Sequence, residues 1–197
     1  MKIFKVLLVL GIIFFISNSV YGPTISVEKE REMMSITRHY YRLERIKEYR
    51  AEQMDLYLEA IGSYESGNNP ASWNKFGYIG KYQFGKAARK STGFGHIDYW
   101  DFRDDHTIWT EEEQDVAMIK LMMKNQAHLN LIIIQCQRDG RMIEGIKVTK
   151  SGLLAAAHLS GAGNVKKYFR TGGRWNPEDA YGTSLETYLL HFSGYYF

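Results

Sequence analysis

The chain contains few of the residues that cross-link or interrupt a fold, with one cysteine and three prolines among 197 residues. Cys136 alone cannot form an intrachain disulfide, and it does not indicate a redox compartment. The net charge of +3 is too small to indicate nucleic-acid binding. Because 45% of the residues are apolar and 24% are charged, collagen-like, low-complexity and acidic disordered chains are excluded. The length suits one domain with a real core.

Aromatic residues are absent from the centre of the chain. Residues 110–167 contain none, whereas 64–109 hold eleven of the twenty-eight aromatics and 168–197 hold nine. We interpret the aromatic-free centre as the aliphatic core of the fold.

The N-terminus has the three-part layout of a secretory signal peptide. Residues 1–5 are basic, 6–16 are apolar and 17–22 are small or polar. The apolar run is too short to span a bilayer comfortably, and no cysteine follows it that could carry a lipid. An uncleaved anchor is the alternative. We expect cleavage after residue 22, export to the periplasm or the outside, and no stable membrane span in the mature chain.

A charged helical segment follows. Residues 27–60 lack glycine and proline, and their apolar residues recur at steps of three and four, which predicts one apolar stripe. The stripe consists of Met33, Ile36, Tyr40, Leu43 and Ile46. A second helix carries Met54, Tyr57, Leu58 and Ile61, and Gly62 and Gly67 are expected to end it. We therefore divide the chain into a signal peptide (1–22), a helical extension (23–50) and a main domain (51–197).

The main domain is predicted to be mainly α, with a small irregular or β-like flap. Residues 71–97, here called the flap, are rich in glycine and aromatics and predict loops with at most one hairpin. Thr110 and Glu113 form a capping box at the start of a long helix. Fourteen of the twenty-one residues 116–136 are apolar on nearly all sides, which predicts a buried central helix that ends at Gly140. Shorter helices are predicted at 150–159, 162–170 and 184–192.

Glu65 is the first candidate for chemistry. It lies four residues after Ile61, in register with a core-facing stripe, so its carboxylate should be partly desolvated. Desolvation favours the neutral acid, which is the form that a general acid needs. Residues 66–97 then contain no aspartate or glutamate but several basic and aromatic residues, a composition that suits an anionic sugar polymer. The basic and aromatic residues are Lys75, Lys81, Lys86, Arg89, Lys90, Trp73, Phe76, Tyr78, Tyr82 and Phe84.

Three short motifs and a late tyrosine resemble those of the soluble lytic transglycosylases, which have a lysozyme-like fold. The motifs are Glu-Ser-Gly at 65–67, Gly-Lys-Tyr-Gln-Phe at 80–84 and Ala-Ala-Ala-His-Leu-Ser-Gly-Ala-Gly at 155–163, and Tyr188 matches the tyrosine. Gln114 falls where the family often has a glutamine at the start of its central helix. The resemblance therefore implies an α+β, lysozyme-like domain over roughly residues 50–192.

The resemblance implies cleavage of peptidoglycan between N-acetylmuramic acid and N-acetylglucosamine. One glutamate, here Glu65, would protonate the glycosidic oxygen and then take a proton from the muramoyl six-hydroxyl, giving a 1,6-anhydro end. No metal and no cofactor is implied. The partners would be peptidoglycan glycan strands, and an envelope or secretion machine is left open.

The same resemblance assigns substrate contacts to five further residues. Ser66 would bond the glutamate or an N-acetyl group, Tyr82 would form a cleft wall, and Gln83 would contact sugar. Tyr188 would bond Glu65. His158 stands where the family has a tyrosine, and we consider it a candidate for substrate binding.

Two other functions are left open. A muramidase would hydrolyse the same bond with Glu65 and a distant aspartate such as Asp98 or Asp101. A non-catalytic peptidoglycan-binding envelope protein is the third candidate, and the His158-Leu159 departure favours it. The acidic and histidine residues within 96–106 match no metal-binding spacing, so no metal is expected there.

Overall fold

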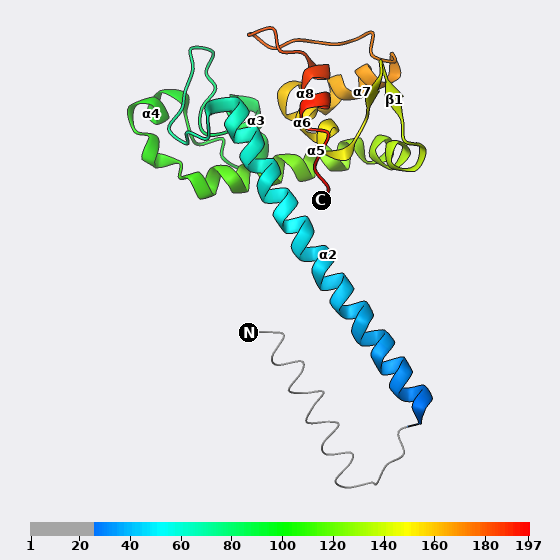
Figure 1. Cartoon of the computed structure of the whole chain (residues 1–197). Helices are drawn as coiled ribbons and strands as arrows, with labels where there is room; N and C mark the ends of the chain where they lie inside the picture. Colours follow the sequence, from blue (N-terminus) through cyan, green and yellow to red (C-terminus); the bar gives the residue numbers. More distant parts are fainter. Residues whose placement is uncertain (1–25) are drawn as a thin grey trace. The chain divides into compact units, whose positions relative to one another are not determined.

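The computed structural model describes residues 26–197, so the predicted signal peptide lies outside the described residues. The chain divides into two units, Met1–Glu48 and Tyr49–Phe197. The described residues are mainly helical, as predicted, with seven α-helices, one short 3-10 helix and one two-stranded antiparallel hairpin (Figure 1). None of these helices combines the length and the apolar character needed to cross a membrane.

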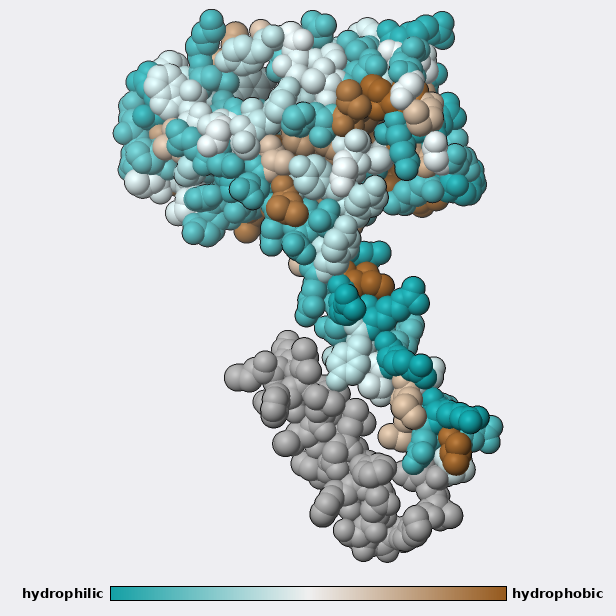
Figure 2. All heavy atoms as spheres, viewed as in Figure 1, coloured by the Kyte–Doolittle hydropathy of each residue, from teal (hydrophilic) through white to brown (hydrophobic). Residues whose placement is uncertain are grey.

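Helix α2 (Val27–Ser66) is one continuous helix of 40 residues, so the prediction of two helices was wrong. Gly62 does not end it. The loop that follows packs directly on this glycine, where an added Cβ would lie 2.3 Å from the Asn68 side-chain oxygen. No residue of 26–48 is buried, and apolar side chains are exposed there among hydrophilic ones (Figure 2). The last turns instead bury Tyr57, Leu58 and Ile61 in the second unit.

The flap contains more helix and less strand than the sequence indicated. Its strand content is limited to the isolated bridges Trp73↔Ile79 and Ile79↔Phe84. Helix α3 (Lys86–Thr92) was not predicted, and neither were α4 (Tyr99–Asp104) and the 3-10 helix η1 (His106–Ile108), which follow the flap. These helices have at most seven residues, too few for a periodic apolar pattern to be recognised.

Helix α5 (Glu111–Asp139) begins and ends where the sequence predicted. Thr110 and Glu113 form both hydrogen bonds of the capping box, and Gly140 closes the helix with a φ of 60°. The prediction that this helix is buried on all sides was wrong. One face packs into the core through residues such as Met118, Met122 and Leu129, but the opposite face is exposed. Its exposed apolar residues are Val116, Ile119, Met123, Leu131 and Ile134.

The buried central helix is instead α6 (Lys150–Ser160), in which every residue from Ser151 to Ala157 is buried. It packs against α5, α7 (Ala162–Arg170) and α8 (Leu185–His191), as Figure 1 shows. Small side chains make this possible, because an added Cβ on Gly152 would lie only 2.5 Å from the backbone oxygen of Leu189 on α8. The three short helices predicted for this region are confirmed.

The one hairpin lies between α5 and α6 and not in the flap. Strand β1 (Met142–Ile143) pairs antiparallel with β2 (Ile146–Lys147), with Ile143 opposite Ile146. The two loop residues, Glu144 and Gly145, both have positive φ, as a tight hairpin turn requires.

The aromatic C-terminus packs back onto the core. The rings of Tyr195 and Phe197 lie 5.3 and 4.8 Å from the ring of Tyr57, centroid to centroid. The Lys150 ammonium group donates a hydrogen bond of 2.9 Å to the Phe197 carbonyl oxygen. The tail therefore covers the part of α2 that enters the second unit.

Candidate active site

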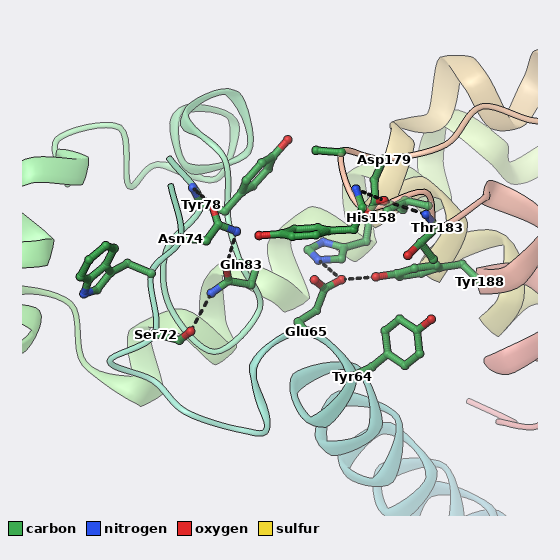
Figure 3. Close-up of a pocket in the computed structure, with 14 residues that line it drawn as sticks. Tyr64, Glu65, Ser72, Asn74, Tyr78, Gln83, His158, Asp179, Thr183 and Tyr188 are labelled. Carbon is green, nitrogen blue, oxygen red and sulfur yellow. Dashed lines mark hydrogen bonds and ion pairs between the residues drawn. The ribbon is translucent and has the colours of Figure 1, made fainter. Parts of the chain in front are cut away.

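A cavity of about 470 Å³ collects side chains from four parts of the second unit (Figure 3). They come from the end of α2, the flap, the end of α6, and the segment that leads into α8. Four of the six residues predicted to act on or bind the substrate line this cavity, namely Glu65, Gln83, His158 and Tyr188, and so do the flap aromatics Trp73 and Tyr78. Ser66 and Tyr82 do not line it.

Glu65 lies in the last turn of α2, with 15% of its side chain exposed. Its Oε1 accepts a hydrogen bond of 2.6 Å from the Tyr188 hydroxyl and lies 3.4 Å from His158 Nε2. Its Oε2 accepts no hydrogen bond from residues 26–197. One carboxylate oxygen is therefore held by the protein, and the other remains available to a substrate.

Tyr188 projects from α8 and is 2% exposed. Its ring packs edge-on against Tyr64, with the ring centroids 5.2 Å apart. Burial raises the pKa of the Tyr188 hydroxyl well above its ordinary value, and the adjacent Glu65 carboxylate raises it further. This hydroxyl therefore keeps its proton and acts as a permanent donor to Glu65.

His158 lies in the last turn of α6, with 6% of its side chain exposed. Its Nε2 is 3.0 Å from the Tyr82 carbonyl oxygen, besides its approach to Glu65. Its Nδ1 is buried and has no hydrogen-bond partner in the described chain. A proton on Nε2 thus has two acceptors within reach, so the imidazole links the flap backbone to the Glu65 carboxylate.

Gln83 presents its side chain to the cavity but uses its polar atoms within the flap. Its amide nitrogen donates to Ser72 Oγ at 3.2 Å and to the Gly80 carbonyl at 2.9 Å, and its oxygen accepts from Asn74 Nδ2 at 2.8 Å. Its φ is 47°, which is strained for a residue with a side chain and costs about 1–3 kcal/mol. Gln83 therefore orients Ser72 and Asn74, which also line the cavity.

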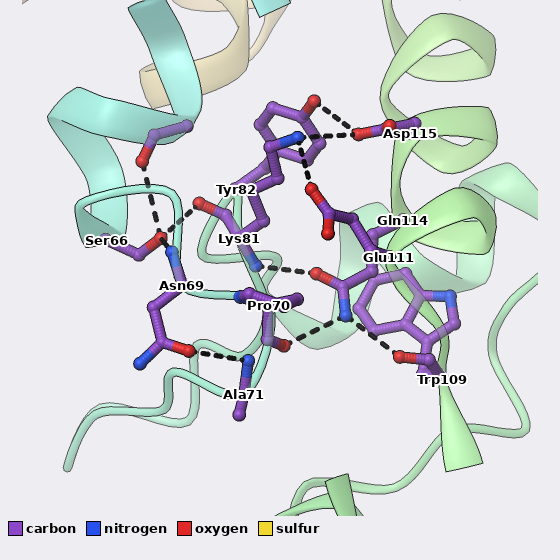
Figure 4. A network of polar contacts seen from close by, with 11 residues as sticks. Ser66, Asn69, Pro70, Ala71, Lys81, Tyr82, Trp109, Glu111, Gln114 and Asp115 are labelled. Atoms are coloured by element: carbon purple, nitrogen blue, oxygen red, sulfur yellow. Dashed lines mark hydrogen bonds and ion pairs between the residues drawn. The ribbon is translucent and has the colours of Figure 1, made fainter. Parts of the chain in front are cut away.

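Tyr82 does not form a cleft wall, so that part of the sequence prediction is corrected. Its side chain is completely buried, and its hydroxyl donates a hydrogen bond of 2.6 Å to Asp115 on α5. The neighbouring Lys81 ammonium group bonds Glu111 and Asp115 at 2.9 and 3.3 Å (Figure 4). Tyr82 points into the core while the next residue, Gln83, points into the cavity.

Ser66 is also a structural residue, contrary to its predicted contact with Glu65 or substrate. Its hydroxyl donates to the Lys81 carbonyl at 2.7 Å and accepts from the Asn69 N–H at 3.1 Å. These bonds tie the end of α2 to the flap (Figure 4). The same hydroxyl also lies 3.3 Å from the Gly62 carbonyl, so its single hydrogen is engaged within the protein.

The cavity includes residues that sequence reasoning missed, above all Asp179. Its Oδ1 accepts hydrogen bonds from the backbone N–H groups of Tyr181 and Thr183, at 2.9 and 2.8 Å. Aspartate followed three residues later by glycine, here Gly182, is a recognisable turn pattern.

Searches against protein-family models, curated proteins and solved structures found no match to this chain.

A second cavity of about 530 Å³ adjoins the first, since Tyr78, Gln83 and His158 line both. It extends past the start of α3 to the exposed Trp100, whose ring stacks on the Arg103 guanidinium. The two cavities together form an aromatic-walled cleft with Glu65 in one half.

Two of the four aspartates within 96–106 serve as helix caps. Asp98 accepts the Trp100 N–H at the start of α4, and Asp105 accepts the Thr107 N–H at the start of η1. Residues 26–197 contain no group of three potential ligand side chains that could hold a metal ion.

Proposed function

We propose that this protein is a lytic transglycosylase with a lysozyme-like domain that cleaves the glycan strand of peptidoglycan. The observation that carries the proposal is the environment of Glu65. One half-buried carboxylate lies in a cleft, with one oxygen bonded by Tyr188 and approached by His158 and the other oxygen unoccupied. This arrangement suits a residue that must hand over a proton and then take one back.

In the first step, Glu65 donates its proton through Oε2 to the glycosidic oxygen. The bond between that oxygen and the anomeric carbon breaks, and the N-acetylglucosamine side leaves as an alcohol. Positive charge then develops on the anomeric carbon and the ring oxygen of the muramoyl sugar. The hydrogen bond from Tyr188 to Oε1 keeps the carboxyl group oriented during this transfer.

In the second step, the six-hydroxyl of the same muramoyl sugar attacks the anomeric carbon. Its proton passes to the Glu65 carboxylate, which restores the acid, and the product ends in a 1,6-anhydro ring. No water is consumed, so one carboxylate suffices for both proton transfers. The aromatic rings of Trp73, Tyr78 and Tyr181 line the cavity and offer stacking faces for the sugars.

Hydrolysis by a muramidase is the second candidate, and the position of Asp179 favours it. Asp179 is the other carboxylate that lines the Glu65 cavity within residues 26–197. Glycosidases that use water need two carboxyl groups, one as acid and one to activate water or form a covalent intermediate. Asp98 and Asp101, which the sequence suggested for this purpose, do not line the Glu65 cavity, although Asp98 lines the second cavity of the same cleft.

The location follows from the substrate and from the predicted signal peptide. Residues 1–22 would deliver the mature chain to the periplasm or the outside of the cell, where peptidoglycan lies. We propose this as the site of action.

Digestion of purified peptidoglycan with mass analysis of the products tests the proposed reaction. We expect the wild type to release anhydro-muramoyl ends, and Glu65→Gln to cleave about 10²–10⁴-fold more slowly because it has no acidic proton. Glu59→Gln makes the same change on an exposed position of the same helix and should cleave like the wild type.

Each alternative predicts a different result in this assay. Products with only reducing ends would show that the protein is a muramidase and not a transglycosylase. Equal digestion by wild type and Glu65→Gln would refute the role of Glu65, and a folded wild type that binds peptidoglycan without cutting it would indicate the non-catalytic binding protein.

A further inference from the structure

Asp179 belongs to a tight turn that fixes its carboxylate before any substrate arrives. Oδ1 accepts hydrogen bonds from two backbone N–H groups, as described above. In addition, the Asp179 N–H donates to the Thr183 carbonyl at 3.0 Å, and the Gly182 N–H donates to the Asp179 carbonyl at 3.2 Å. Glu178 and Ser184 form a bridge that closes the turn. The backbone therefore holds this side chain in one orientation.

The second carboxylate oxygen of Asp179, Oδ2, has no hydrogen-bond donor in the described chain, and the charge of Asp179 has no ion-pair partner there. Figure 3 shows the side chain at the edge of the pocket beyond Tyr188 and His158. Asp179 is partly buried, so its carboxylate lies at the border between the protein and the cavity.

The charge of Asp179 acts on Tyr188, the residue that donates a hydrogen bond to Glu65. Burial and the Glu65 carboxylate are the main reasons that the pKa of the Tyr188 hydroxyl is raised, and the Asp179 carboxylate raises it further. Asp179 thus acts electrostatically on the residue that is bonded to the general acid. The other groups that line this cavity, apart from Glu65, are neutral side chains and His158.

We propose that Asp179 is a catalytic residue, whose fixed negative charge stabilises the positive charge that develops on the anomeric carbon when the glycosidic bond breaks. This inference rests on the proposed glycan cleavage. Glu65 cannot supply that charge at the start of the step, because it is then the neutral acid. Asp179 forms no covalent bond and accepts no proton, so the proton balance between Glu65, the leaving alcohol and the six-hydroxyl is unchanged.

Asp179→Asn separates the charge from the turn. Asparagine keeps a side-chain oxygen that can accept the two N–H groups, but it has no charge and places an NH₂ group where Oδ2 was. We expect kcat to fall by about 10²-fold, the size of effect seen when a group that stabilises transition-state charge is removed, with KM changed by less than about threefold. The melting temperature should stay at the wild-type value.

The control is Asp105→Asn, which makes the same change in a similar turn outside both cavities. Its kcat should equal that of the wild type. Asp179→Ser, which also keeps an oxygen for the turn without the charge, serves if the asparagine variant does not fold. A kcat within about threefold of wild type in the folded variant, or a loss confined to KM, would overturn the proposal.

Cleavage in water labelled with heavy oxygen tests the role of Asp179 separately from the proposed glycan cleavage. Anhydro ends without label, together with the kcat loss in Asp179→Asn, support the stabilising role. Labelled reducing ends that disappear in Asp179→Asn would overturn it, because Asp179 would then activate water. If Glu65→Gln cleaves like the wild type, the proposed function itself fails; if only Asp179→Asn retains full kcat, the inference alone fails.

Discussion

The two oxygens of the Glu65 carboxylate have different surroundings. Oε1 is bonded by the Tyr188 hydroxyl and approached by His158 Nε2, whereas Oε2 has no partner in the described chain. A carboxyl group with both oxygens occupied would have to break a bond before it could exchange a proton with substrate. The asymmetry therefore keeps the group oriented and still lets one oxygen react.

Tyr188→Phe removes only the hydroxyl that orients Glu65. A hydrogen bond to a charged group contributes about 1.5–3 kcal/mol, so we expect kcat to fall by about 10–100-fold. Because burial and Glu65 raise the pKa of Tyr188, its hydroxyl stays protonated, so deprotonation of Tyr188 should add no pH dependence to this loss between about pH 5 and about pH 9. A pH–rate profile of both proteins measures this ratio.

The matched control for this variant is Tyr168→Phe. Tyr168 is also buried, but its hydroxyl has no hydrogen-bond partner in the described chain and it lies outside both cavities. Its kcat should be unchanged. A Tyr188→Phe enzyme with wild-type kcat would show that the carboxyl group is oriented without the hydroxyl.

At the level of elements, the flap is held in place mainly by α5. Gln114 is completely buried and bonds three backbone groups: its oxygen accepts from Lys81 N–H at 2.6 Å, and its nitrogen donates to the Pro70 and Trp109 carbonyls at 3.0 and 2.9 Å. The Lys81 side chain adds two ion pairs to the same helix. The flap depends on α5 because its own bridges are isolated.

Gln114→Met keeps the volume and removes all three hydrogen bonds. Because each buried backbone group that loses its partner costs about 1–3 kcal/mol, we expect the free energy of unfolding to fall by about 3 kcal/mol or more. Urea denaturation measures this change. Cleavage should fall as well, because the flap carries Asn74 and Gln83 into the cavity.

Gln126→Met on the same helix is the control. Gln126 is exposed, so its replacement should change the free energy of unfolding by less than about 0.5 kcal/mol. A loss below about 1 kcal/mol for Gln114→Met would show that the flap is held by other contacts.

At the level of the whole molecule, the fold is stabilised within the second unit. The buried hydrophobic residues run from Tyr57 to Phe192, and no residue of 26–48 is buried. The apolar stripe of the helical extension is thus exposed in the described chain, with Met33 39% and Ile36 62% exposed. Exposed apolar side chains add little to the stability of the fold.

A chain that starts at Tyr49 should therefore fold and cleave like the longer protein. We expect its melting temperature to lie within about 2 °C of the longer chain and kcat to be unchanged, measured by thermal unfolding and by product release. Removal of only the last three residues should lower the free energy of unfolding by about 1–2 kcal/mol, because Tyr195 and Phe197 pack around Tyr57. The melting temperature should then fall by several degrees. A larger fall in melting temperature on removal of the extension than on removal of the tail would contradict the view that the second unit alone stabilises the fold.

Local patterns in the sequence predicted the boundaries of the helices after residue 109 well. The capping box at Thr110, the stop at Gly140 and the three short helices after residue 149 are all confirmed. Capping and glycine stops depend on residues within a few positions of each other, so they can be read without the fold. The half-buried position of Glu65 was predicted for the same reason, from its spacing to Ile61.

Which helix is buried, and which side chains face the cleft, could not be read in this way. The apolar residues of α5 outnumber what its partners can cover, whereas α6 is covered because Gly152 and its alanines let α8 approach closely. Tyr82 and Gln83 are neighbours in sequence, and only the contact with Asp115 on α5 decides which of them enters the core.

The sequence by itself determined a mainly helical chain, the ends of the helices after residue 109 and the carboxylate at the end of α2, because these follow from local spacing. The tertiary structure decided the composition of the cavity. It places Tyr188 beside Glu65, from which it is 123 positions away in the sequence, and it places Asp179 in the same cavity. It also engages the side chains of Tyr82 and Ser66 in hydrogen bonds within the protein. Contacts between distant segments depend on how whole elements pack, and no local pattern carries that information.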